Sequence, residues 1–197
     1  AARKVKETLR SRQVPLLALA GAFTFVIMMF NIPIPGGTTG HAVGGTLAAI
    51  VLGPWGACLA ISVTLIIQAL IFGDGGVWAI GANCFNIAFV LPFLGYAVYR
   101  ALSAGGRNRV FASVIGSYVG LNAAAFCAAV EFGIQPVLFR TAAGVPLYCP
   151  YGLSQAIPAM MFGHLTVAGP IEALITGIVV YYLKRSYDEA LFYKPAT

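Results

Sequence analysis

The chain has 197 residues, of which 59% are hydrophobic and only 9% are charged, and its formal net charge is +6. Soluble domains carry about 25% charged residues. This composition therefore excludes an ordinary soluble fold and indicates an integral membrane protein, whose apolar surface is stable against lipid.

The basic residues lie at the ends of apolar segments. Eleven of the 12 Lys and Arg residues fall in the lead 1–13, the loop 100–109 and the tail 184–197, and Arg140 is the exception. Because Lys and Arg are enriched in cytoplasmic loops, we expect these three regions on the cytoplasmic side of the membrane. This distribution gives no indication of a surface for nucleic acid.

Six apolar runs predict an all-α membrane bundle of about six spans, forming a single domain over residues 1–197. In chain order they cover residues 14–30, 41–52, 55–72, 78–99, 110–132 and roughly 161–183. A spanning helix needs about 20 residues, so the second run is short and the third borderline. We expect Gly53-Pro54 to divide these two runs, because proline lacks a backbone donor and glycine adopts turn conformations. Six crossings from a cytoplasmic start place residues 31–40, 73–76 and 133–159 outside.

The tract NIPIPGGTTGHAVGG, residues 31–45, contains one of the two histidines of the chain, His41. It follows Thr39 and several glycines, which allow backbone to approach a small ligand closely. The alternative is a histidine that only bonds a neighbouring carbonyl group. One imidazole cannot hold a metal ion alone, so the rest of the sequence must decide.

A second tract, QALIFGDGGVWAIGANCFN, returns polar groups to the same predicted outer face. Gln68, Asp74, Asn83 and Asn86 are costly in or beside hydrocarbon unless they are paired. Asp74 is also a common turn residue between glycines, and the two asparagines are also suited to joining helices.

The last run carries Glu172 and, two helical turns earlier, His164. Both can face one side of a helix, and an ionisable group within a membrane is a functional hypothesis by default. The sequence leaves open whether they form a structural polar network or take part in transport. The first run carries Ala18 and Ala22, small residues that permit close helix contact with a partner or within the bundle.

No nucleotide-binding motif and no hydrolase motif is present. Any transport would therefore depend on a partner or on an ion gradient. The sequence thus leaves open a transport subunit, a membrane scaffold without transport activity, and a proton-coupled carrier that works alone with Glu172 and His164 as its relay.

The two tracts, together with GHLTVAGPIEALIT, resemble the CbiM/NikM family, the substrate-binding components of energy-coupling-factor transporters for cobalt or nickel. The resemblance implies uptake of Co²⁺ or Ni²⁺ across a bacterial or archaeal cell membrane. It implies a membrane coupling subunit, paired ATPase subunits and a small accessory membrane subunit as partners. His41 matches the family's internal metal-binding histidine, and Ala18 and Ala22 match the helix that meets the coupling subunit.

Family members are similar to one another in opening with Met-His, which supplies further metal ligands, and with an additional helix. Ala1 does not match that start. We therefore expect that a first helix precedes these residues, and that residues 1–197 alone bind the metal at least a hundredfold more weakly than a chain beginning with Met-His.

Overall fold

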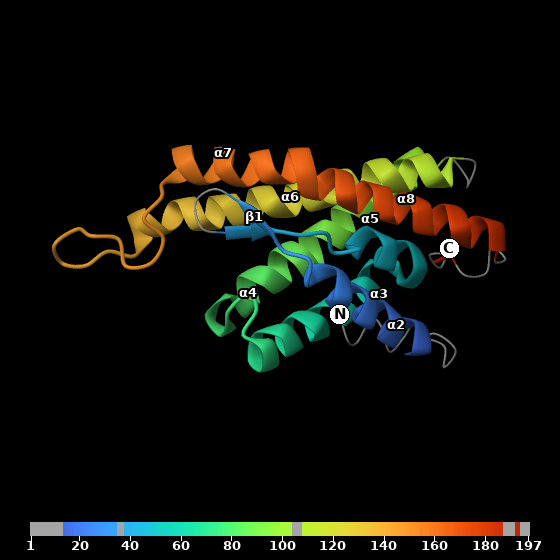
Figure 1. Cartoon of the computed structure of the whole chain (residues 1–197), viewed down its shortest axis with the longest axis horizontal. Helices are drawn as coiled ribbons and strands as arrows, with labels where there is room; N and C mark the ends of the chain where they lie inside the picture. The colour runs from blue at the N-terminus through green and yellow to red at the C-terminus, as the bar shows by residue number, and fades with distance from the viewer. Residues whose placement is uncertain (1–13, 35–37, 104–107, 187–191, 194–197) are drawn as a thin grey trace.

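The computed structural model describes residues 14–34, 38–103, 108–186 and 192–193, so the basic lead, part of the loop 100–109 and most of the tail lie outside the described residues. The helices run in the order shown in Figure 1: α2 (Val14–Met28), α3 (Gly45–Ile67), α4 (Ile80–Asn83), α5 (Leu91–Leu102), α6 (Arg109–Leu138), α7 (Leu153–Gly163) and α8 (Gly169–Ser186). A 3₁₀ turn covers Val77–Ala79, and π-helical segments cover Gln68–Phe72, Cys84–Val90 and His164–Ala168.

These helices join into four continuous segments that are long and apolar enough to cross a membrane, within the described part of the chain. They are Gly45–Phe72, Val77–Leu102, Arg109–Leu138 and Leu153–Ser186, and α2 is a shorter apolar helix. A mostly helical chain with several candidate membrane spans is therefore confirmed, consistent with a membrane bundle. The predicted count of six spans is not confirmed, because most of the second and third apolar runs falls within the one continuous segment Gly45–Phe72.

Helix α3 is kinked at the predicted break. Gly53 has φ 78° and ψ 160°, outside the helical region, and Pro54 follows it. The backbone N–H of Tyr193 donates to the carbonyl of Ile50 (2.9 Å) just before the kink. Gly53-Pro54 thus bends α3, and the helix begins at Gly45, four residues after His41.

The loop predicted over residues 133–159 is shorter in the structure. Helix α6 continues to Leu138, and α7 begins at Leu153. Gly133 does not end its helix but allows a close contact, because a Cβ there would lie 2.7 Å from the Cα of Leu153. The connection therefore covers only residues 139–152.

A small β-hairpin departs from the all-α prediction. Strand β1 (Ile32–Ile34) pairs antiparallel with β2 (Thr38–Gly40), with Pro33 opposite Thr39. The hairpin packs against α7 (Figure 1). It brings the end of β2, directly before His41, next to the α7–α8 segment.

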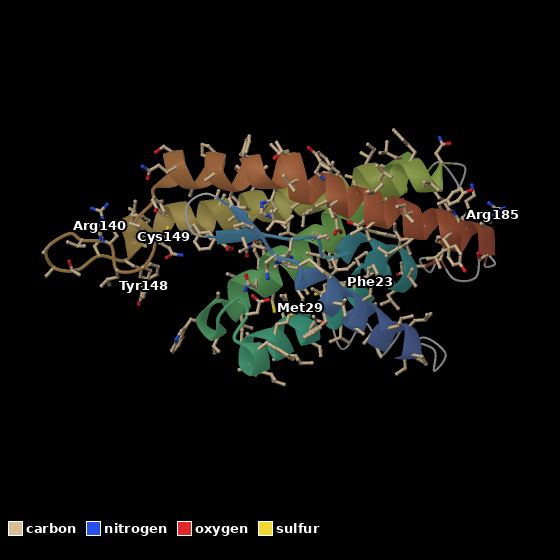
Figure 2. The ribbon with its side chains drawn as sticks, viewed as in Figure 1. Phe23, Met29, Arg140, Tyr148, Cys149 and Arg185 are labelled. Carbon is tan, nitrogen blue, oxygen red and sulfur yellow. The ribbon has the colours of Figure 1, made fainter. Side chains whose placement is uncertain are left out.

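Helix α6 is central to the packing, since it contacts α5, α7 and α8, while α2 packs on α3. Long helices lie side by side along the long axis of the molecule (Figure 1). Figure 2 shows Arg185, at the end of α8, at one end of this axis and Arg140 and Tyr148 at the other. The end of α8 and the loop 139–152 are therefore far apart, as opposite sides of a membrane would require.

Candidate functional site

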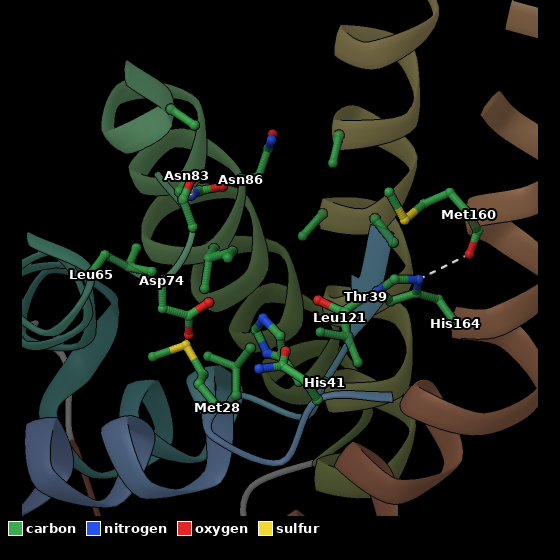
Figure 3. Close-up of a pocket in the computed structure, with 18 of the residues that line it drawn as sticks. Met28, Thr39, His41, Leu65, Asp74, Asn83, Asn86, Leu121, Met160 and His164 are labelled. Carbon is green, nitrogen blue, oxygen red and sulfur yellow. Dashed lines mark hydrogen bonds between the residues drawn. The ribbon is translucent and has the colours of Figure 1, made fainter. Parts of the chain in front are cut away.

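A cavity of about 350 Å³ lies between the hairpin and the helices. It brings together residues from both tracts singled out in the sequence and from the start of the last run (Figure 3). Its lining includes Thr39, His41, Gln68, Asp74, Asn83, Asn86 and His164, with Met28, Asn31 and Met160. Glu172 is not among the lining residues.

Each of the three π-helical segments contributes a polar side chain to this cavity. Gln68 begins the first segment, Asn86 lies in the second and His164 begins the third. Widened helical turns of this kind are rare and occur frequently at functional sites. Their convergence on one cavity is independent support for a site there.

His41 stands in the irregular stretch before α3 and is partly exposed. Its Nδ1 lies 3.1 Å from the carbonyl oxygen of Ala42. Since a carbonyl only accepts, Nδ1 carries the proton in this bond and Nε2 keeps its lone pair. Burial lowers the pKa of His41, and the nearby His164 lowers it further. The hydrogen bond to Ala42 and the charge of Asp74 raise this pKa, but by less than burial lowers it. The neutral imidazole is thus favoured, with one nitrogen free to bind a metal ion.

His164 is the second imidazole of the cavity. Its Nδ1 lies 2.9 Å from the carbonyl oxygen of Met160, as Figure 3 shows, so the same reasoning leaves its Nε2 with a lone pair. The ring packs so closely against the hairpin that a Cβ added to Gly40 would lie 3.3 Å from Nε2. His164 is only 7% exposed, so its access to a ligand is narrower than that of His41.

The amide side chains complete a polar wall. Asn83 donates to the carbonyl of Gly75 (3.2 Å), and Asn86 donates to Oε2 of Glu131 (2.7 Å). The asparagines therefore do join segments, as one sequence interpretation held, while also lining the cavity. Gln68 Nε2 and Asn86 Oδ1 are buried without a hydrogen-bond partner. Buried polar atoms of this kind need water or a polar ligand, so the cavity is suited to a polar occupant.

Glu172 lies elsewhere, fully buried at the start of α8, where it accepts hydrogen bonds from the backbone of Val43 and Gly44. His164 and Glu172 thus have different hydrogen-bond partners, the carbonyl of Met160 for His164 and the backbone N–H groups of Val43 and Gly44 for Glu172. The sequence offered no signal for this contact, since its partners lie 129 and 128 residues away. It also gave no reason to single out the thioethers of Met28 and Met160.

Within the described residues, no group of three or more His, Cys, Asp or Glu side chains is placed to hold a metal ion. A metal ion at His41 would therefore need other donors, such as backbone nitrogen, an amine or water. Ala18 and Ala22 are exposed on the outer face of α2, where a partner could reach them.

Comparison with known proteins identifies the family of the chain. The family described as "CbiM: Cobalt uptake substrate-specific transmembrane region" matches residues 1–190. The chain belongs to the CbiM family. Its relatives are named as nickel or cobalt transport proteins.

One relative of this CbiM chain is "Fused nickel transport protein NikMN" of Rhodobacter capsulatus, which is 55% identical over 193 residues. That match covers 96% of the chain but 56% of the relative, and a second relative, from Lactiplantibacillus plantarum, is covered to 59%. The chain thus spans little more than half the length of these two proteins.

Two solved structures share the fold. "Crystal Structure of an Truncated Transition metal Transporter" has a TM-score of 0.91 and 58% identity, covering 95% of this chain and 87% of that one. "Crystal Structure of an transition metal transporter" has a TM-score of 0.90 and 59% identity, covering 93% and 81%.

Proposed function

We propose that this CbiM chain is the substrate-capture subunit of an ATP-driven importer of cobalt or nickel ions of the energy-coupling-factor type. The observation that carries the proposal is His41, whose Nδ1 lies 3.1 Å from the carbonyl oxygen of Ala42 and whose imidazole lines a polar cavity. Imidazole is a suitable ligand for both Co²⁺ and Ni²⁺. Transport is named for relatives with more than half of their aligned residues identical to this chain.

His41 acts as a metal ligand in this proposal, and a Met-His segment supplies further nitrogen ligands, as the family resemblance implies. Thr39, Gln68, Asp74 and Asn83 support the site from the cavity wall. Asp74 contributes a negative charge that favours a cation near His41. His164 is a polar wall residue, held by its own bond to Met160.

Energy comes from partners in this proposal. The sequence holds no nucleotide-binding motif, so paired ATPase subunits act through a membrane coupling subunit, with a small accessory membrane subunit. Helix α2 meets the coupling subunit through Ala18 and Ala22, whose exposed small side chains allow a second helix to approach closely.

The chain crosses the cell membrane six times in this proposal, with residues 1–13 and 184–197 on the cytoplasmic side. Residues 41–52 make one of the crossings. Four residues before α3 reach at most about 13 Å, and eight helical residues add about 12 Å, close to the roughly 30 Å hydrocarbon core. The kink at Gly53 then returns the chain through the rest of α3.

Uptake of radioactive Co²⁺ and Ni²⁺ by cells tests this proposal. Cells that carry the chain with its partner subunits should accumulate metal, and the same cells with an ATPase subunit inactivated in its nucleotide site should not. Uptake that persists without ATP hydrolysis would indicate a carrier that works alone. Absence of both uptake and metal binding would indicate a scaffold.

A further inference from the structure

The buried carboxylate of Glu172 is not used by the cavity described above. Its side chain is 0% exposed, in the first turn of α8, and it does not line the cavity. A buried ionisable group within a membrane bundle is costly unless it is well bonded. Its partners therefore indicate what it does.

The hydrogen bonds of Glu172 come from backbone N–H groups at the start of α3. Oε2 accepts from Val43 N (2.7 Å) and Gly44 N (2.8 Å), and Oε1 also accepts from Gly44 N (3.0 Å). The first N–H groups of a helix lack partners within it and carry partial positive charge. Gly44, at the N-cap position, has no side chain to cap the helix, and the Glu172 carboxylate accepts the N–H of Gly44 and that of Val43 before it.

The peptide group between Ala42 and Val43 connects this carboxylate to His41. Its N–H donates to Glu172, and its C=O accepts from Nδ1 of His41 (3.1 Å). A peptide group is planar and rigid, so fixing its N–H also fixes the direction of its C=O. The carboxylate thus holds the group that orients the imidazole.

We propose that Glu172 is a positioning residue for metal capture, acting on His41 through the Ala42–Val43 peptide. The inference rests on the proposed role of His41 as a metal ligand. Metal-binding histidines usually donate their second N–H to a carboxylate or carbonyl, which fixes the ring and raises its basicity. Here a carbonyl does so and is itself held by a carboxylate, and hydrogen bonds in such chains polarise one another. Helix α8 is thereby linked to the metal ligand.

Substitution Glu172→Gln tests the proposal in the full-length protein. The amide keeps the shape but replaces one acceptor oxygen with a donor that faces backbone N–H groups. We expect the affinity for Ni²⁺ to fall about 10- to 100-fold, the range seen when the support of a metal ligand is lost. We also expect the d–d absorption of bound Co²⁺ to shift, because the imidazole changes its direction.

Thr176→Val is the matched control. Thr176 lies one turn further along α8, is equally buried, and its hydroxyl has no hydrogen-bond partner. This variant should keep the affinity and the spectrum of the wild type. An effect that comes only from disturbing α8 would alter both variants alike and would overturn the proposal.

Normal affinity and an unchanged spectrum in Glu172→Gln would also overturn it. If His41→Ala loses metal binding in the same experiment, the metal site stands and only the role of Glu172 falls; if His41→Ala binds normally, both fall. Should Glu172→Gln fail to fold, Glu172→Asp withdraws the carboxylate by one methylene and should weaken binding at least about tenfold. Wild-type affinity in Glu172→Asp would contradict the proposal.

Discussion

Replacing Gly53 with alanine should lower the free energy of unfolding more than the same substitution at a glycine with open space around it. The φ of 78° and ψ of 160° at this position belong to a region essentially limited to glycine, and a residue forced into it costs roughly 1–3 kcal/mol. A Cβ there would also lie 2.7 Å from the ring of Tyr193. Displacing this ring strains the bond from Tyr193 N to Ile50 O, which contributes about 0.5–1.5 kcal/mol. The expected loss is about 2–4 kcal/mol.

Substitutions at two other glycines separate the cost of the backbone angle from the cost of the contact with Tyr193. Gly73 has φ 71°, and a Cβ added there would have no neighbouring atom within 4 Å, so Gly73→Ala should cost only about 1–2 kcal/mol. Gly81 lies in helix α4 with open space around it. Gly81→Ala should be neutral or stabilise by up to about 1 kcal/mol, because alanine favours helix.

Thermal unfolding of the three purified variants in the same detergent checks this order. The melting temperature should be lowest for Gly53→Ala, intermediate for Gly73→Ala, and equal to or above that of the wild type for Gly81→Ala. A wild-type melting temperature for Gly53→Ala would refute the reasoning, since it would mean that neither the backbone angle nor the Tyr193 contact matters at the kink.

Two further predictions concern binding to the coupling subunit and the pH dependence of metal affinity. Ala22→Leu should weaken association with the coupling subunit and spare metal binding, because a bulky side chain on the exposed face of α2 prevents close helix approach. Co-purification measures this association, with Ala22→Gly as the control. A normal yield of the complex would contradict the prediction. Metal affinity should fall with acid, because imidazole and amine nitrogens bind metal only when they are unprotonated. Since burial lowers the pKa of His41, the part of this fall that His41 contributes should lie below the usual histidine value of about 6.5. Calorimetric titration between neutral and mildly acidic pH measures the effect, and an affinity that does not fall with acid would contradict it.

Much of the helical architecture could be predicted from hydropathy alone. The run at residues 14–30 corresponds to α2, and the run at 78–99 lies within the span Val77–Leu102. Helix ends at glycine and proline were the weak point. The outer region was predicted to begin at Gly133, but α6 runs past this residue to Leu138, since Gly133 serves a contact with the next helix.

Several residues of the cavity were also predictable, because polar side chains are conspicuous in an apolar sequence. His41, Asp74 and His164 each stand out by this criterion, and all three line one cavity. Their use by a metal ion stays a prediction. The bonds of Glu172 could not be predicted, since backbone N–H groups 128 and 129 residues away carry no sequence signal. The π-helical segments are equally silent in the sequence, because they depend on how neighbouring helices pack.

Titration of the full-length protein with Ni²⁺ and Co²⁺, comparing the wild type with His41→Ala, tests the central claim most directly. His41 stands outside the helices and strands and is partly exposed, so the variant should fold as the wild type does. Removing a direct ligand should cost at least about 100-fold in affinity, the upper end of what loss of supporting groups costs. His164→Ala serves as the comparison within the same cavity and should retain most of the affinity. Wild-type affinity in His41→Ala would contradict the account, and a large loss confined to His164→Ala would assign the metal ligand to the other imidazole.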